Sequence, residues 1–262
     1  MAPVLVLVFI VLLALAVFFY KKPPRKVNLP ANYKELLAQH VAFYRALDEA
    51  GKSRFEEKIK ELLGYIRIHG VNTTVDDLDR LLVAAGGVIP IFGFPEWKYD
   101  NLRDVLLYPD TFNRENFSAE GHNRDILGMV GEGALQRVMI LSKPALHRGF
   151  DETHGRENTA IHEFVHLLDK EDGAVDGLPE ALLNRQYTHP WLQQVAENIE
   201  AIKSGHSDIN AYGATNKAEF FAVAAEFFFT RPDEFRHKHP ELYVLMLRVF
   251  QQEPPLAKEN MP

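Results

Sequence analysis

The sequence predicts one helix-rich α+β domain with a small sheet, preceded by a single N-terminal transmembrane helix. Three observations lead to this fold class. The chain opens with an uninterrupted apolar run at residues 4–20. Most of the remaining chain has apolar residues at three- and four-residue spacing, which is typical of amphipathic helices. Two short apolar runs, at 105–108 and 138–141, are each followed by a proline and are typical of strands.

The apolar run at residues 4–20 reads VLVLVFIVLLALAVFFY, and about 20 mostly apolar residues are enough to span a bilayer. The basic segment KKPPRK follows it, and the positive-inside rule then places the rest of the chain in the cytoplasm. We therefore expect a single-pass membrane protein. A signal peptide cleaved after Ala16 is the alternative, although no Lys or Arg precedes the apolar run. The expected boundaries are an anchor at 1–20, a basic proline-rich linker at 21–30 and one domain at 31–262.

The composition limits the chemistry that the domain can use. Its net charge of −7 and the lack of a basic stripe give no sign of nucleic-acid binding. The sequence has no cysteine, which excludes disulfides, thiol chemistry and cysteine-ligated zinc. Any metal site must therefore be built from histidine and carboxylate side chains.

Helices within the domain are placed by apolar periodicity and by their end signals. A capping box formed by Ser53 and Glu56 is expected near the start of the second helix, and Pro240 is a point where the last helix can break. The phenylalanines at 220–229 are expected in the core. The expected helices are 33–47, 54–66, 76–85, 158–169, 190–202, 215–229 and 234–252.

Residues 162–166 read His-Glu-Phe-Val-His within one of these helices. Positions four apart lie on one face of a helix, so His162 and His166 can bind the same ion, and Glu163 can reach a water molecule on it. Two histidines and an open position for water suit a zinc ion that hydrolyses an amide bond. The competing interpretation is that no metal binds and the two histidines belong to the core of a packed helix. If a metal does bind, two histidines with a carboxylate also suit iron.

A hydrolytic zinc site usually has a third protein ligand. Glu219 and Glu226 are carboxylates in an otherwise apolar helix, and because they are two turns apart they share a face. A buried carboxylate is costly unless it is paired or bound to a metal. Glu219 also fits a capping box with Asn216. Glu226 also fits a surface position, a partner for a nearby cation, or a carboxylate that orients a ligand imidazole. The spacing therefore leaves the third ligand open.

Two segments carry a resemblance to a known family. The segments HEFVHLLDKEDGAVDGLP and INAYGATNKAEFFAVAAEFFFTRPDEF resemble the active-site helix and the third-ligand helix of the Mlc titration factor A family of bacterial glucose-regulated zinc metallopeptidases. The likeness covers roughly residues 30–255 and leaves out the apolar N-terminus. The family is similar in its catalytic core to anthrax lethal factor, and the resemblance implies a zincin-like metallopeptidase domain.

The resemblance implies a role for each site residue. His162, His166 and Glu219 would be the zinc ligands, and Glu163 would be the catalytic base. In both families a tyrosine stands seven residues before the ligand glutamate, and here that tyrosine is Tyr212. It would donate a hydrogen bond to the developing oxyanion. An ordinary surface position is the alternative for Tyr212.

The sequence thus predicts a zinc-dependent peptidase, and the resemblance implies aminopeptidase-like activity on a peptide substrate. The alternative is a binding protein that sequesters a transcriptional repressor, with catalysis secondary, since the family takes its name from that role. Glu163 favours catalysis, because a pure binder has no need of a base beside the metal. A structural zinc protein is disfavoured, because structural sites are usually closed and rich in cysteine.

Two further features have two interpretations each. Asp169 lies three residues after His166, and it either orients that imidazole or serves as a helix-terminus or loop-bracing residue. The strand expected at 138–141 is either an edge strand, which a peptide substrate joins by strand addition, or a plain buried strand.

Overall fold

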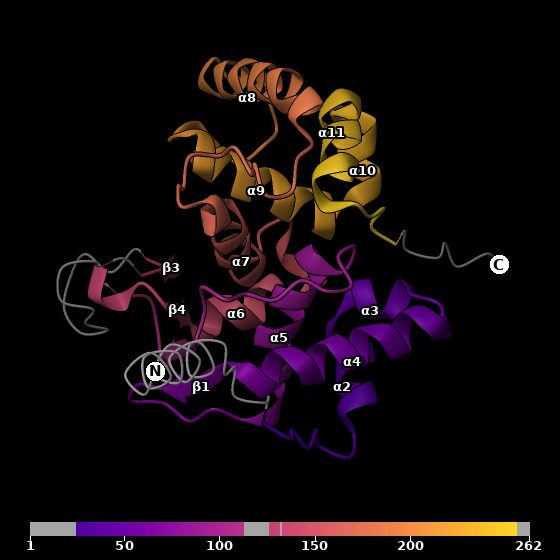
Figure 1. Cartoon of the computed structure of the whole chain (residues 1–262), viewed down its shortest axis with the longest axis vertical. Helices are drawn as coiled ribbons and strands as arrows, with labels where there is room; N and C mark the ends of the chain where they lie inside the picture. The colour runs from indigo at the N-terminus through magenta and orange to yellow at the C-terminus, as the bar shows by residue number, and fades with distance from the viewer. Residues whose placement is uncertain (1–24, 113–125, 132, 256–262) are drawn as a thin grey trace, which may run out of the picture.

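The computed structural model describes residues 25–112, 126–131 and 133–255. These residues form a mostly helical fold with one small sheet (Figure 1). The α-helices are α2 (Tyr33–His40), α3 (Ala42–Ala46), α4 (Glu49–Tyr65), α5 (Asp77–Ile91), α6 (Lys143–Gly149), α7 (Thr159–Asp169), α8 (Thr188–Lys203), α9 (Lys217–Thr230), α10 (Pro232–Lys238) and α11 (Pro240–Phe250).

A mixed sheet of four strands has the order β1-β2-β4-β3. The parallel strands are β1 (Arg67–Gly70), β2 (Asp104–Tyr108) and β4 (Val138–Ser142), and β3 (Gly128–Val130) pairs with β4 in the antiparallel direction. The two predicted strands are confirmed as β2 and β4. Because β4 lies between β2 and β3, the edge-strand interpretation of this segment is wrong. β3 forms that edge of the sheet instead.

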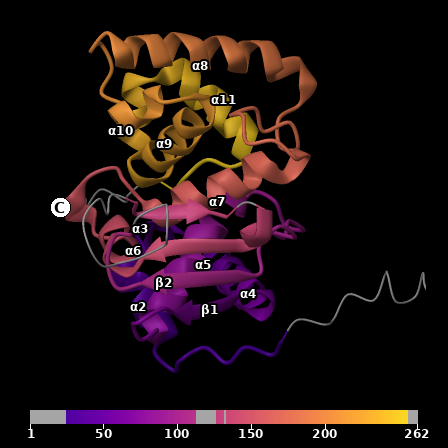
Figure 2. The same ribbon diagram turned by 90° about the vertical axis from the view of Figure 1, so that its left-hand side faces the viewer.

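Helix α7 occupies the centre of the fold. It packs against α5, α6 and α9, and against β3. In Figures 1 and 2, α7 lies between the C-terminal helices α8–α11 and the part of the chain that holds the sheet and α2–α5. Ile161, Phe164, Val165 and Leu168 of α7 are each at most 1 % exposed. These contacts fix the direction of the side chains on the remaining face of the helix.

Side-chain caps begin both α7 and α9. Asn158 Oδ1 accepts a hydrogen bond from the amide of Ile161 (3.0 Å) at the start of α7, and Asn216 Oδ1 accepts one from the amide of Glu219 (2.9 Å) at the start of α9. Each bond satisfies an amide that has no partner within the first turn. The phenylalanines of α9 are at most 6 % exposed, which confirms their predicted place in the core: Phe220, Phe221, Phe227, Phe228 and Phe229.

Several helix boundaries differ from the predicted ones. The helix expected at 33–47 is divided into α2 and α3, and the last expected helix breaks before Pro240 into α10 and α11. α4 begins earlier than expected, because Asp48 caps it by accepting a hydrogen bond from the amide of Gly51 (2.7 Å). The predicted capping box at Ser53 is wrong, since this residue lies inside α4.

Among the described residues, no helix has the length and apolar character that a membrane span requires. The longest of them, α4, has 17 residues and carries charged side chains along its length, whereas a spanning helix needs about 20 mostly apolar residues. The anchor predicted at residues 4–20 lies outside the described residues. The predicted transmembrane helix and single-pass membrane location are therefore not supported. The fold class is corrected to a mostly helical domain with a small mixed sheet.

A buried carboxylate joins α5 to α6. Asp79 is fully buried, and its oxygens accept hydrogen bonds from His147 Nε2 (2.6 Å) and from the amide of Asp76 (2.8 Å), while Lys143 Nζ lies 2.7 Å away. Burial alone would raise the pKa of Asp79, but the hydrogen bonds from His147 and Lys143 outweigh it and lower that pKa below its ordinary value. A charged carboxylate therefore holds together two helices that pack against α7.

Replacing Asp79 with alanine is expected to lower the free energy of unfolding by about 1.5–3 kcal/mol at pH 7, because it removes the buried carboxylate that accepts hydrogen bonds from His147 and the Asp76 amide and pairs with Lys143. The pKa of Asp79 is lowered by folding, so its contribution is present above about pH 4 and is lost as the pH falls through the folded pKa. Urea denaturation at pH 7 and pH 3 measures both effects. Asp77→Ala, at an exposed position of the same helix, is the control and should cost below about 1 kcal/mol. An equal loss for both variants would contradict the prediction.

Candidate metal centre

The motif helix α7 brings its two histidines together. His162 and His166 are four residues apart, which places them on one face of the helix. Their Nε2 atoms are 3.1 Å apart, and their ring centroids are 4.7 Å apart with the planes at 84°. Each side chain is 12 % exposed, so both imidazoles face a partly enclosed space.

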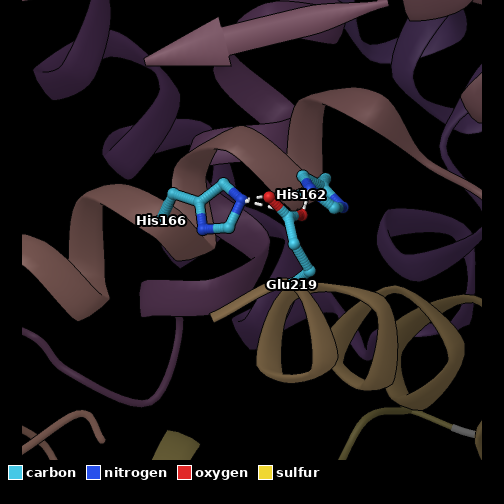
Figure 3. Close-up of side chains that lie close together, drawn as sticks. All are labelled: His162, His166 and Glu219. Carbon is cyan, nitrogen blue, oxygen red and sulfur yellow. Dashed lines mark hydrogen bonds and ion pairs between the residues drawn. The ribbon is translucent and has the colours of Figure 1, made fainter. Parts of the chain in front are cut away.

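Glu219 reaches the two histidines from α9. Its Oε2 lies 3.0 Å from His162 Nε2 and 3.4 Å from His166 Nε2. Figure 3 shows its carboxylate directed at the two imidazoles from the facing helix. The ligand atoms of the three residues all lie within 4.8 Å of one another. We call this group the His–His–Glu cluster.

The cluster has the spacing that a tetrahedral metal site needs. Ligands about 2.0–2.2 Å from zinc at tetrahedral angles lie about 3.3–3.6 Å from one another. The three pairs of ligand atoms here are separated by 3.0, 3.1 and 3.4 Å. Two imidazole nitrogens and a carboxylate oxygen also make up a known set of zinc ligands. The residues thus fit a divalent metal ion.

The charges of the cluster suit a cation. Burial alone would raise the pKa of Glu219, but hydrogen bonds with His162 and His166 outweigh it and hold that pKa well below its ordinary value. Burial alone would lower the pKa of His162, but the carboxylates of Glu226 and Glu219 outweigh it and raise that pKa. Two carboxylates thus favour a proton on His162, and a metal ion would take the place of that proton.

Glu226 supports His162 from the far side of the ring. Its Oε1 lies 2.7 Å from His162 Nδ1, while the cluster is formed on Nε2. Its other oxygen accepts a hydrogen bond from the amide of Asn158, the residue that caps α7. A carboxylate in this place fixes the orientation of an imidazole and keeps a proton on Nδ1, which leaves Nε2 as the ligand atom. The surface interpretation of Glu226 is wrong, since its side chain is 9 % exposed.

Glu163 lies beside the cluster and is 4 % exposed. Burial raises the pKa of its carboxyl above the ordinary value, although the nearby His162 and His166 oppose this effect. Its Oε2 has no hydrogen-bond partner within the described part of the chain. A Cβ atom at Gly128 would lie 2.8 Å from Glu163 Oε1, so β3 passes directly beside this carboxylate. Glu163 therefore keeps a buried carboxylate oxygen that no described residue hydrogen-bonds.

Tyr212 stands on the solvent side of the cluster, on the short 3-10 helix η5 (Ala211–Ala214). Its ring centroid is 6.0 Å from that of His162, and its side chain is 53 % exposed. Asn210 begins η5: its Oδ1 accepts a hydrogen bond from the Tyr212 amide (2.9 Å), and its Nδ2 donates one to Glu157 (2.6 Å). These bonds join η5 to the residues that precede α7 and hold Tyr212 near the cluster.

A cavity of about 490 Å³ contains the cluster. It lies between α7, η5, the start of α9 and the edge strand β3, which contributes Gly128, Met129 and Val130 to its wall. The five residues predicted for the site all line this cavity: His162, Glu163, His166, Tyr212 and Glu219. The structure thus brings the predicted residues to one place.

Asp169 braces the loop that follows α7. Its Oδ2 accepts a hydrogen bond from the amide of Gly177 (2.9 Å), whose φ of 76° favours glycine. Burial raises the pKa of Asp169 to about 6. His166 Nδ1 has no hydrogen-bond partner among the residues that the structure describes. The bracing interpretation of Asp169 is therefore confirmed, and the alternative that it orients His166 is wrong.

Asn158, Lys170 and Gly128 are among the residues that line or support the site and were not predicted from the sequence. Asn158 could have been found, because an asparagine directly before an apolar helix is a common cap. Lys170 could have been found as well, since it stands four residues after His166 on the same helical face. Gly128 had no signal, because its contact with Glu163 arises only when β3 meets α7.

Two histidines one helical turn apart, a carboxylate from a facing helix and a buried glutamate beside them define a candidate metal-dependent hydrolase. Residues 20–251 match the family described as glucose-regulated metallo-peptidase M90, and the chain belongs to this family. The resemblance to the Mlc titration factor A family is thereby confirmed.

Similarity to individual proteins supports this assignment. Mlc titration factor A of Escherichia fergusonii is 30 % identical over 199 residues, which cover 72 % of this chain and 74 % of the relative. The uncharacterized protein slr2042 of Synechocystis sp. is 30 % identical over 236 residues, which cover 86 % of both chains. Mlc titration factor A of Escherichia coli O1:K1 is 30 % identical over 169 residues, which cover 61 % of this chain and 62 % of the relative.

Proposed function

We propose that the chain is a zinc-dependent peptidase in which His162, His166 and Glu219 hold the ion. The observation that carries this proposal is the convergence of three ligand atoms beside the buried carboxylate of Glu163, inside a cavity. Membership of a metallopeptidase family supports the same class of reaction. A structural metal site would need neither the cavity nor the additional carboxylate.

Each residue has a task in this reaction. Zinc, when bound, would supply Lewis acidity, which polarises the peptide carbonyl and makes an attacking water easier to deprotonate. Glu163 accepts the proton of that water and donates it to the leaving amine. Burial of Glu163 favours the first step, because a poorly solvated carboxylate accepts a proton more readily than one in water. The Tyr212 hydroxyl donates a hydrogen bond to the carbonyl oxygen as that oxygen becomes negative.

The peptide substrate lies along β3 in this proposal. An edge strand offers backbone donors and acceptors that an extended peptide can pair with. β3 is at one edge of the sheet, lines the cavity and passes beside Glu163. A peptide added to this edge therefore has its backbone next to the base and to the cluster.

The proposal is tested by adding the full chain to a mixed peptide pool and analysing the products by mass spectrometry. The zinc-loaded protein should cleave peptides, and chelation should stop cleavage until zinc is restored. Products shortened from the amino end would identify aminopeptidase-like trimming, and internal cuts would identify an endopeptidase. If protein with bound zinc leaves every peptide intact, the proposal is overturned.

A second candidate function is the sequestration of a transcriptional repressor. The observation that favours it is the name Mlc titration factor A, which the relatives from Escherichia fergusonii and Escherichia coli O1:K1 carry. A pull-down with the purified Mlc repressor tests it on wild-type protein and on Glu163→Gln. Capture by both would support a binding role that does not depend on catalysis, and capture by neither would argue against that role.

Replacing Glu226 with glutamine is expected to lower zinc affinity about 10–100-fold. The carboxylate faces two donors, His162 Nδ1–H and the Asn158 amide, whereas an amide side chain has only one acceptor oxygen. Competition with a chromophoric chelator measures the affinity. Glu200→Gln, on the exposed face of α8, is the control and should bind zinc like the wild type. Unchanged affinity in the Glu226 variant would show that this residue does not orient His162.

Replacing Gly128 with alanine is expected to lower kcat/KM at least about tenfold while zinc stays bound. The added methyl group would lie 2.8 Å from Glu163 Oε1 and 2.7 Å from Thr159 Cγ2, so the carboxylate must move. Gly213→Ala is the control, because its methyl group would meet no atom closer than 3.5 Å. Equal kinetics for the two variants would show that β3 does not position Glu163.

A further inference from the structure

Lys170 continues the row of side chains that forms the cluster. His162, His166 and Lys170 are spaced by four residues each, so Lys170, at the C-cap of α7, continues the stripe that the two histidines form. Lys170 follows the last residue of α7, half-buried, and lines the same cavity as the two histidines. Four residues of helix advance by about 6 Å, and an extended peptide advances by about 3.3 Å per residue. The backbone of Lys170 is therefore offset from that of His166 by about the length of two extended substrate residues.

No carboxylate of the described residues forms an ion pair with Lys170. Its Nζ donates one hydrogen bond, to the carbonyl of Gly131 (3.2 Å), the residue that follows β3. No described carboxylate oxygen lies within 4.0 Å of it. Lysines elsewhere in the fold do find such partners, as Lys143 does with Asp79 and Lys238 with Asp208. A neutral donor would serve equally well to hold the Gly131 carbonyl, so the contact does not account for the charge.

The rest of the cavity is acidic, which makes the position of Lys170 distinctive. Among the described residues that line the cavity, four are glutamates and Lys170 is the one lysine or arginine. Glu157 lies just before α7, while Lys170 lies just after its last residue. An extended peptide in the cavity thus meets a carboxylate at one end and an ammonium at the other. An ammonium in a partly enclosed space binds a carboxylate more strongly than in bulk water.

We propose that Lys170 is a specificity-determining residue that binds a carboxylate of the peptide substrate. This inference rests on the proposed peptidase function. Two sources can supply the carboxylate: the side chain of an Asp or Glu near the scissile bond, or the free C-terminus of a short peptide. Lys170 would hold either one while β3 pairs with the peptide backbone.

Binding is measured by titration calorimetry with the zinc-loaded Glu163→Gln protein, which keeps peptides intact. The first comparison is tetra-alanine with a free C-terminus against tetra-alanine amide. The second comparison uses amidated tetra-alanine with one residue replaced: Asp at a given position is compared with Asn at the same position. We expect the preferred carboxylate peptide to bind about tenfold tighter than its amide partner. Preference in the first pair would identify the C-terminus as the source, and preference in the second would identify the side chain.

The preference is then measured after adding Lys170→Gln, which removes the charge and keeps a donor for Gly131. The ratio of affinities should fall to about one, and Lys170→Glu should invert it, since the introduced negative charge then repels carboxylates. Lys203→Gln, at an exposed position of α8, should leave the ratio unchanged. An affinity ratio that is unchanged in Lys170→Gln overturns the inference. Cleavage of the peptide pool by the wild type would then show that the peptidase proposal stands without it. Failure of both cleavage and peptide binding would overturn the two together.

Discussion

Replacing Glu163 with glutamine is expected to lower kcat about 10²–10⁴-fold, which is the usual contribution of a general base. Glutamine has nearly the same shape as glutamate but cannot accept the proton of the attacking water. The substituted side chain is not one of the three ligands, so zinc affinity should stay close to that of the wild type. Initial rates on one peptide substrate and zinc content by atomic absorption measure the two quantities.

The fold should tolerate this substitution, because it removes a buried charge whose oxygen has no partner in the described residues. A melting temperature equal to or above that of the wild type is the expected result. Glu200→Gln on α8 is the matched control for loss of one negative charge. Glu163→Gln protein that cleaves peptides at the wild-type rate would remove Glu163 from the mechanism and leave the base unassigned.

The motif was predictable because it is local. His162 and His166 owe their common face to the 3.6-residue period of one helix, and neither the sheet nor the other helices are needed to place them. The helix itself was predictable from its apolar residues and its following turn. The same holds for the strands β2 and β4, which are continuous apolar runs with a proline after them.

The relation between Glu219 and Glu226 was not predictable from spacing. The two residues share a face of α9, and both reach His162, but at opposite ring nitrogens. Glu219 meets Nε2 together with His166, while Glu226 meets Nδ1 and the amide of Asn158. The angle at which α9 crosses α7 decides which carboxylate meets which nitrogen. That angle is set by tertiary packing, and the helical periodicity of the sequence gives no information about it.

The sheet edge was missed for a similar reason. β3 is three residues long and reads Gly-Met-Val, which is too short for an alternating pattern to stand out. β1 contains a histidine and a glycine and has no apolar run. Without β3, the segment that forms β4 had no neighbour on that side and fitted an edge strand equally well. The N-terminal anchor was inferred from hydropathy at residues 4–20, and the described helices give it no support.

Replacing Glu219 with alanine is expected to lower zinc affinity by more than about 100-fold. This loss exceeds the one expected for a residue that only orients a metal ligand. Only two imidazole ligands remain in the cluster, and the negative charge that attracts the cation is gone. Zinc at about 100 times its dissociation constant should stabilise the wild type by about 2.7 kcal/mol, and this gain should be absent in the variant at the same zinc concentration. Peptide hydrolysis should be lost together with the metal.

Thermal melts with and without zinc separate loss of metal from loss of fold. The Glu219→Ala protein should melt cooperatively in the absence of zinc, because Asn216 still caps α9 through the amide of residue 219. Glu200→Ala is the control and should show the same zinc-dependent rise in melting temperature as the wild type. A full zinc-dependent rise in Glu219→Ala would show that this residue is not the third ligand. It would also remove the cluster as the basis of the peptidase proposal, since Glu226 faces the other ring nitrogen of His162.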